Sequence, residues 1–254
     1  MNIFLSDLDN TLIYSHRHLL PADKTVMEFL HGRDQSYMTS ETYRFLKYTG
    51  WIKVIPVTSR NEEQFRRLKL QGLYSGYAVI CNGGKLLIDG LEDPDWTAES
   101  MKNSESQISE LDETAKEIGQ LIPTVTMHHP EPYMYYFRTS EPEKWLEHIN
   151  EKLPRKNVLI QCDKRKIYLF AQAINKGNAA KRIKQLLHPD LVVSAGDGVM
   201  DIPMLNESDY AFAPSAIYDK VSCSGKYTVD GEIISDQICR KVTELHDHGI
   251  LKEL

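Results

Sequence analysis

The 254-residue sequence has little of what marks secreted, membrane or nucleic-acid-binding proteins. It holds only four cysteines, far apart and without C-x-x-C spacing, so we expect free thiols rather than a disulfide framework or a zinc site. No apolar run is long enough to span a bilayer, and a first strand that begins almost at Met1 leaves no room for a signal peptide. A net charge of −6 attracts neither nucleic acid nor an anionic membrane. We therefore expect a cytoplasmic protein with neither kind of partner; the sequence is silent on oligomeric state.

Short apolar runs alternate with helical patterns in the two end segments of the chain. The runs 3–7, 53–59 and 191–197 are nearly continuous in apolar residues, which is typical of strands covered on both faces in a parallel sheet. The helical patterns between them cover 40–49, 61–71 and 176–187. This alternation predicts an α/β fold with a doubly wound, Rossmann-like parallel sheet. A turn at 32–34 between two extended runs predicts a β-hairpin.

The middle of the chain follows another pattern. Its expected elements are a polar stretch (92–104), a helix (105–121), strands within 124–138, a helix (141–152) and strands at 157–162 and 166–171. Because hairpins connect several of these strands, we expect an α+β domain inserted into the first. The predicted core domain is 1–85 with 172–254, and the predicted insertion is 86–171.

Two aspartates, Asp7 and Asp9, follow the first apolar run. On a strand they point to the same side, where like charges repel and cost free energy. Mg²⁺ relieves this repulsion because it prefers oxygen ligands from one or two carboxylates, and an aspartate is also a nucleophile for phosphorus. From this pair alone, a turn or helix-cap aspartate remains an open alternative.

Further polar positions follow strands or begin helices. Thr58 ends the second apolar run, where a hydroxyl beside a helix N-terminus can hold phosphoryl oxygens, although a plain N-cap is also common there. Lys176 begins a helix, where the helix dipole disfavours a cation unless an anion neutralises it. Asp197 and Asp201 follow the third run and form a second acidic cluster that suits Mg²⁺.

These stretches resemble a known family. DLDNT, VTSR, NKGNA and GDGVMDIPM stand in the order of the four motifs of the haloacid dehalogenase (HAD) phosphatase superfamily. CNGG resembles the turn that precedes a type-two α/β cap in the Cof-type and sucrose-phosphatase-like subgroup, which makes 86–171 the cap. Two positions depart from the pattern: Met200 stands where asparagine is usual, and Ser59 where glycine is common.

The resemblance implies a Mg²⁺-dependent phosphatase that hydrolyses a small phosphate monoester, such as a sugar phosphate, through an aspartyl-phosphate. In this implied phosphatase Asp7 is the nucleophile, and Asp9 is the general acid and base. Thr58 and Lys176 bind the transferring phosphoryl group. Thr11 orients the loop of the first motif. The implied metal ligands are Asp7, Asp9 through its backbone carbonyl, Asp197 and Asp201, the last directly or through water.

The middle segment offers candidates for substrate contact. The run YMYYFR alternates between two faces of a strand, and we expect Tyr136 and Arg138 to meet substrate while the alternate side chains pack against helices. We interpret the basic turn at 162–166, which includes Lys164, as a solvated hairpin tip.

Two other functions stay open. A phosphomutase or other phosphotransferase would pass the phosphoryl group to a second substrate instead of water. A non-catalytic protein would only bind a phosphate ligand, and the intact acidic and basic motif positions argue against it.

Overall fold

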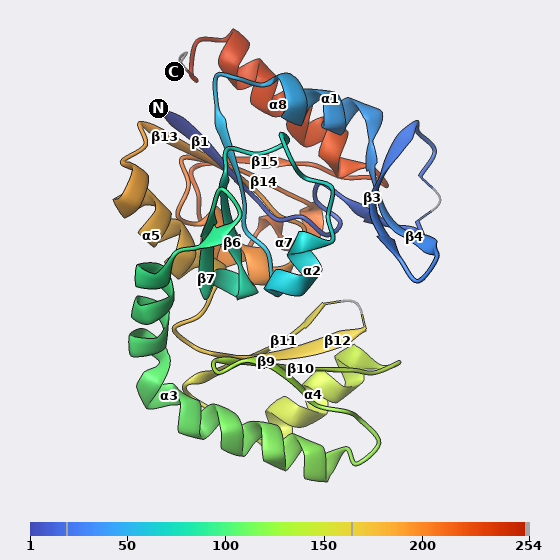
Figure 1. Ribbon diagram of the computed structural model, residues 1–254, viewed down its shortest axis with the longest axis vertical. Helices are drawn as coiled ribbons and strands as arrows, with labels where there is room; N and C mark the ends of the chain where they lie inside the picture. Colours follow the sequence, from blue (N-terminus) through green and yellow to red (C-terminus); the bar gives the residue numbers. More distant parts are fainter. Residues whose placement is uncertain (19, 164, 252–254) are drawn as a thin grey trace. The chain divides into compact units, whose positions relative to one another are not determined.

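The computed structural model describes residues 1–18, 20–163 and 165–251, and its contacts divide the chain into two compact units (Figure 1). The core unit comprises Met1–Glu92 and Lys176–Leu254, and the inserted unit comprises Asp93–Asn175. Each boundary predicted from the sequence lies a few residues before the corresponding unit boundary. Whether the units fold as separate domains stays a prediction. Lys164, in the predicted solvated tip, lies outside the described residues.

A parallel five-stranded sheet forms the centre of the core unit, in the order β15-β14-β13-β1-β5. The strands are β1 (Asn2–Ser6), β5 (Lys53–Pro56), β13 (Leu191–Ala195), β14 (Tyr210–Ala213) and β15 (Gly225–Thr228). All five residues of β1 are buried, as expected for a strand covered on both faces. The predicted α/β fold with a Rossmann-like parallel sheet is confirmed.

The helices of the core unit are α1 (Ser40–Tyr48), α2 (Glu62–Arg66), α5 (Lys176–Leu187), α6 (Ile202–Leu205), α7 (Ser215–Tyr218) and α8 (Ile234–Asp247). The α1 and α8 helices lie side by side (Figure 1). Asp236 of α8 joins them by accepting hydrogen bonds from the hydroxyls of Thr39 and Thr42.

The prediction of a helix over 61–71 is wrong beyond Arg66, where α2 ends. A capping box formed by Asn61 and Gln64 starts the helix as its sequence suggests. The chain then leaves the helical path because the backbone N–H of Lys69 donates to the carbonyl of Met27, 2.8 Å away in a neighbouring strand. A tertiary backbone contact therefore overrides the helical pattern.

The predicted hairpin is present as β3 (Lys24–Leu30) and β4 (Arg33–Thr39), joined by the short β2 (Tyr14–Ser15) into a three-stranded sheet. Its pairing register shifts on both sides of Glu28. Such bulges re-aim a side chain, and the Glu28 carboxylate is buried although its strand neighbours Phe29 and Leu30 are not.

A second small sheet follows α2 and contains β6 (Tyr77–Ile80), β7 (Lys85–Ile88) and β8 (Leu91–Glu92). The turn between β6 and β7 comprises Cys81, Asn82 and Gly83, and it is strained at the first two, whose φ angles are 53° and 58°, whereas glycine adopts the φ of 111° at Gly83 without a steric cost. The first two of their backbone N–H groups donate to the carbonyls of Arg60 and Thr58. The turn thereby fixes the loop that follows β5.

The inserted unit packs two helices on an antiparallel sheet with the order β11-β12-β10-β9. Its elements are α3 (Pro94–Leu121), β9 (His128–Glu131), β10 (Met134–Arg138), α4 (Pro142–Lys152), β11 (Val158–Asp163) and β12 (Lys166–Ala171). Phe137, Ile167 and Leu169 are fully buried in this unit.

The polar stretch 92–104 was expected to precede a helix at 105–121, but α3 begins at Pro94. Asp93 caps the helix by accepting a hydrogen bond from the backbone N–H of Trp96 at 2.8 Å. Trp96, Ser100 and Ser104, spaced by four residues, form part of the buried face. Serines on this face hide the apolar periodicity that marks a helix in the sequence.

Among the described residues we find no helix with the length and hydrophobicity that a membrane span requires. No disulfide joins the four cysteines.

Two glycine-to-alanine changes test how tightly α5 is packed. A Cβ at Gly177 in α5 would lie 2.7 Å from the Cβ of Pro203 in α6, whereas one at Gly119 in α3 would meet no atom within 4 Å. Overpacking costs about 1–3 kcal/mol, and alanine gains up to about 1 kcal/mol over glycine within a helix. Gly177→Ala should therefore lower the melting temperature, and the matched Gly119→Ala should raise it. Thermal denaturation followed by circular dichroism checks both, and a rise with Gly177→Ala would contradict the close packing of α5 on α6.

Candidate functional site

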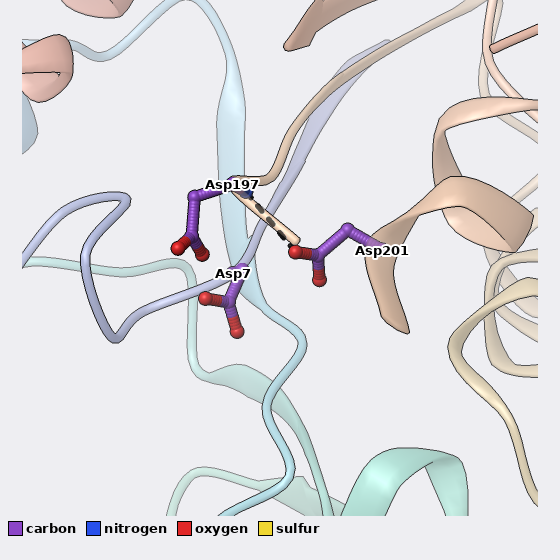
Figure 2. Close-up of side chains that lie close together, drawn as sticks. All are labelled: Asp7, Asp197 and Asp201. Carbon is purple, nitrogen blue, oxygen red and sulfur yellow. Dashed lines mark hydrogen bonds between the residues drawn. The ribbon is translucent and has the colours of Figure 1, made fainter. Parts of the chain in front are cut away.

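Three carboxylates converge at one edge of the parallel sheet (Figure 2). Asp7 directly follows β1 and Asp197 follows β13; because these strands are parallel neighbours, their carboxyl ends meet at the same edge. The backbone N–H of Asp7 extends the ladder by donating to Ala195 at 3.0 Å. Asp201 ends the short 3₁₀ turn Val199–Asp201. Each of the three aspartates offers one oxygen, and these oxygens lie within 4.8 Å of one another.

The loop after β13 is shaped around the side chain of Asp201. Its Oδ2 accepts hydrogen bonds from the backbone N–H of Asp197 at 3.1 Å, drawn in Figure 2, and from that of Gly198 at 2.9 Å. Any Cβ at Gly196 would lie 2.3 Å from the Cβ of Asp201, so this close approach requires glycine. The SAGDG sequence thus brings the two acids of the second cluster together.

Lys176, the first residue of α5, bridges two of these acids. Its Nζ lies 2.5 Å from Oδ1 of Asp7 and 2.5 Å from Oδ1 of Asp201, and its side chain is almost fully buried. Burial lowers the pKa of Lys176, but the carboxylates of Asp201 and Asp7 outweigh burial and raise it above its ordinary value. The lysine that the helix dipole disfavours at this position is therefore held as a cation by two anions.

Asp7 remains in an excess of negative charge. Burial raises the pKa of its carboxyl well above the ordinary value, Lys176 lowers it, and the carboxylates of Asp201, Asp197 and Asp9 raise it further. The ammonium of Lys176 therefore does not offset burial and the neighbouring carboxylates, and the ionised form of Asp7 is destabilised.

The first-motif loop supplies polar groups to the same cluster. The Thr11 hydroxyl lies 3.4 Å from Oδ2 of Asp7 and 3.3 Å from Oδ1 of Asp197. Asn10, with a φ of 67°, donates from Nδ2 to Oδ2 of Asp197 at 3.2 Å. The Asn10 Oδ1 is buried and has no hydrogen-bond partner in the part of the chain that the structure describes. Asn10 was not among the predicted site residues, although it lies within the DLDNT motif.

This donor set fits a hard divalent cation. Oxygens of Asp7, Asp197 and Asp201 can approach one ion. The excess negative charge around Asp7 would be neutralised by such an ion. The buried Oδ1 of Asn10 is a further oxygen acceptor nearby. The Asp9 carboxylate does not belong to this group. The predicted contact of a metal with its backbone carbonyl stays a prediction.

Asp9 is paired instead with Arg60, which lies in the loop between β5 and α2. Arg60 donates from Nε to Oδ2 of Asp9 at 2.7 Å and from a terminal nitrogen to Oδ1 at 3.0 Å. Its other terminal nitrogen donates to the buried carboxylate of Glu28 at 3.0 Å. Burial disfavours the charge on Arg60, but Asp9 and Glu28 more than compensate and raise its pKa. Sequence reasoning assigned nothing to Arg60 or Glu28, and only the VTSR motif pointed near them.

Thr58 follows β5, the other neighbour of β1, and is therefore at the same sheet edge as Asp7. Its side chain is buried, and its hydroxyl accepts a hydrogen bond from the backbone N–H of Arg60 at 3.2 Å. The hydroxyl can still donate to an anion. Its predicted contact with a phosphoryl group stays a prediction.

The two candidates for substrate contact lie on β10 in the inserted unit. Tyr136 stacks on His128 with ring centroids 4.7 Å apart, and the ammonium of Lys166 lies 5.1 Å from the Tyr136 ring. Arg138 is exposed and pairs in register with Lys166 on β12. Their role in substrate binding stays a prediction.

Comparisons with known proteins agree on the fold. A family model described as haloacid dehalogenase-like hydrolase matches residues 73–222. No curated protein sequence matches the chain. The structure of sucrose-phosphatase from Synechocystis sp. PCC6803, in complex with sucrose and phosphate, is similar with a TM-score of 0.63 and 15% identity over 99% of this chain and 98% of that one. The C-terminal domain of C. albicans trehalose-6-phosphate phosphatase is similar with a TM-score of 0.60 and 14% identity, over 96% and 93% of the two chains.

The raised pKa of Asp7 has a consequence for stability. A carboxyl whose pKa is raised by folding costs stability as the pH rises from its ordinary pKa to the raised one, and the full cost remains above that, so Asp7 costs stability at neutral pH. In chelator at neutral pH, Asp7→Asn should therefore raise the melting temperature, by about 2–4 °C for each kcal/mol relieved. The exposed Asp219→Asn is the control and should leave it unchanged. A lower melting temperature for Asp7→Asn than for the unaltered protein in chelator would contradict the excess of negative charge around Asp7. Addition of Mg²⁺ should raise the melting temperature of the unaltered protein.

Proposed function

Because the chain belongs to the haloacid dehalogenase-like hydrolase family, which confirms the resemblance seen in its sequence, we propose that it is a Mg²⁺-dependent phosphatase. Its reaction is the hydrolysis of a small phosphate monoester through an aspartyl-phosphate on Asp7. The observation that carries this proposal is the buried Asp7 carboxylate, which shares one lysine with Asp201 and crowds against Asp197. Repulsion among these carboxylates does not stabilise the fold. It suits a site in which the carboxylates bind a cation and Asp7 accepts a phosphoryl group.

Asp7 would act as the nucleophile of the first step. One of its oxygens attacks the phosphorus, the bond from phosphorus to the ester oxygen breaks, and that oxygen takes a proton from Asp9. In the second step Asp9 takes a proton from water, which attacks the phosphorus and releases inorganic phosphate from Asp7. The two acids of the DLD motif would thus divide attack and proton transfer.

Lys176 prepares Asp7 for this attack. Its hydrogen bond to Oδ1 fixes the carboxylate, while Oδ2 lies 3.4 Å from the Thr11 hydroxyl. The same ammonium can stabilise negative charge on the phosphoryl oxygens, as Thr58 would do from the neighbouring strand end. Asp7, Asp197 and Asp201 would hold Mg²⁺, which when bound neutralises charge on the carboxylates and on the phosphoryl oxygens.

We propose a sugar phosphate as the class of substrate. Support comes from the fold that the chain shares with sucrose-phosphatase and trehalose-6-phosphate phosphatase structures. It also comes from Tyr136 and Arg138 on β10, since an aromatic ring and a guanidinium suit the apolar face and the hydroxyls of a sugar. No observation favours the phosphomutase alternative. A protein that only binds phosphate would not need a further acid, Asp9, that is paired with Arg60 and separate from the other three aspartates.

Metal dependence tests the proposed function. The purified protein should release nitrophenolate and phosphate from para-nitrophenyl phosphate with Mg²⁺, lose this activity in EDTA and regain it when Mg²⁺ is restored. Ca²⁺ should support it poorly, because Ca²⁺ prefers more ligands at longer distances. Asp7→Asn should be inactive under every condition, and the exposed Asp219→Asn should match the unaltered protein. Full activity in EDTA, or turnover by Asp7→Asn, would contradict the proposal.

A further inference from the structure

We propose that Arg60 is the positioning residue for Asp9, and that Glu28 of the β3–β4 hairpin anchors it. The inference rests on the proposed function, because it explains how the second acid of the DLD motif is oriented for proton transfer. Arg60 touches neither substrate nor metal in this account and acts through Asp9.

The contact between Arg60 and Asp9 is a two-point one. Nε and one terminal nitrogen of the guanidinium each donate to a different oxygen of the same carboxylate, at 2.7 and 3.0 Å. Such a fork fixes both the direction and the plane of the carboxyl group, which a single hydrogen bond does not. Each carboxylate oxygen keeps a second lone pair, so Asp9 can still exchange a proton with a reacting oxygen.

Glu28 holds the guanidinium from the other side. The remaining terminal nitrogen of Arg60 donates to Oε2 of Glu28 at 3.0 Å and to the carbonyl of Gln64 at 3.2 Å. Oε1 of Glu28 accepts a hydrogen bond from Arg67 at 2.9 Å. The bulge in β3 accompanies this buried carboxylate, whose side chain is only 7% exposed. Arg60 is therefore a fixed part of the core unit, with 13% of its side chain exposed.

Attachment of the β3–β4 hairpin to the rest of the core unit does not by itself explain the hydrogen bonds between Arg60 and Asp9. Glu28 and Arg67 already join the hairpin to the segment after α2, and Lys69 adds a backbone hydrogen bond to Met27. The pairing of Arg60 with Asp9 extends the network to the loop of the first motif. The Asp9 carboxylate is paired with this guanidinium and is not part of the group formed by the other three aspartates, so the two acids of one motif have different partners.

The experiment compares two leaving groups. Para-nitrophenyl phosphate releases an anion that needs no proton, whereas phenyl phosphate releases a more basic phenolate that does. Their kcat/KM values cover substrate binding and the first chemical step but not the later hydrolysis of the phosphoenzyme. Asp9→Asn should lower kcat/KM for phenyl phosphate by roughly 10²–10⁴ and much less for the nitrophenyl ester. Arg60→Met should show the same selective loss, at least about tenfold larger for phenyl phosphate, since Asp9 keeps its charge but loses its orientation.

Three companion variants separate positioning from folding. Arg60→Lys keeps the charge but not the fork, so it should still lose phenyl phosphate selectively. Arg67→Met removes the guanidinium that bonds Oε1 of Glu28 but leaves the contacts of Arg60 with Oε2 of Glu28 and with Asp9 in place, so it should leave the ratio of the two kcat/KM values unchanged. The double variant Asp9→Asn with Arg60→Met should lose no more on phenyl phosphate than Asp9→Asn alone, because the two residues act as one unit.

The outcomes distinguish this inference from the proposed function. Equal loss on both esters with Arg60→Met and Arg60→Lys, or independent losses that multiply in the double variant, would overturn the inference while Asp9 keeps its role. Equal loss on both esters with Asp9→Asn itself would remove Asp9 as the acid, and the inference would fail with it. Failure of the unaltered protein to hydrolyse either ester would contradict the proposed function.

Discussion

The salt bridge of Lys176 with Asp7 and Asp201 is the interaction around which the candidate site of the core unit is arranged. It is buried, and one cation serves two anions, so its geometry has to be held by structure rather than by solvent. Parallel pairing of β1 with β13 brings the strand ends together, and packing of Gly177 against Pro203 lets α5 approach closely enough for its first residue to reach them. A displacement of any of these elements leaves buried charge without a partner.

A second pairing keeps the two acids of the DLD motif apart. Asp7 faces Lys176, whereas Asp9 faces Arg60 and through it Glu28. The repulsion expected between neighbouring carboxylates is thus relieved at Asp9 by a guanidinium and only in part at Asp7, which shares one ammonium with Asp201. The structure concentrates its excess negative charge around Asp7, where our account places the metal and the nucleophile.

Much of this arrangement could be predicted from the sequence. Continuous apolar runs indicated the strands, and acids directly after two of them indicated an acidic cluster at one sheet edge. A lysine at a helix start indicated that an anion would lie beside it, and the structure supplies two. These features are local in the sequence or follow from the parallel pairing of neighbouring strands.

Other features depend on contacts that local patterns do not encode. Burial of Glu28 needs a bulge in its strand, and its pairing with Arg60 joins residues 32 positions apart. The early start of α3 was hidden because serines occupy part of its buried face, and α2 ends early because Lys69 bonds to the hairpin. Tertiary contacts decide the burial of Glu28 and the end of α2 against the local pattern, whereas α3 begins at a local cap on Asp93.

In the proposed reaction Asp7 carries the phosphoryl group between the two steps. The most direct measurement is peptide mass spectrometry of the Asp9→Asn variant, quenched in acid within its first turnover of para-nitrophenyl phosphate. This variant keeps the nucleophile but lacks the group that deprotonates water, so the phosphoenzyme should accumulate. We predict one phosphoryl group, removable by hydroxylamine as an acyl phosphate is, on the peptide that contains Asp7. A phosphoryl group on any other residue, or turnover without one in this variant, would contradict this role of Asp7.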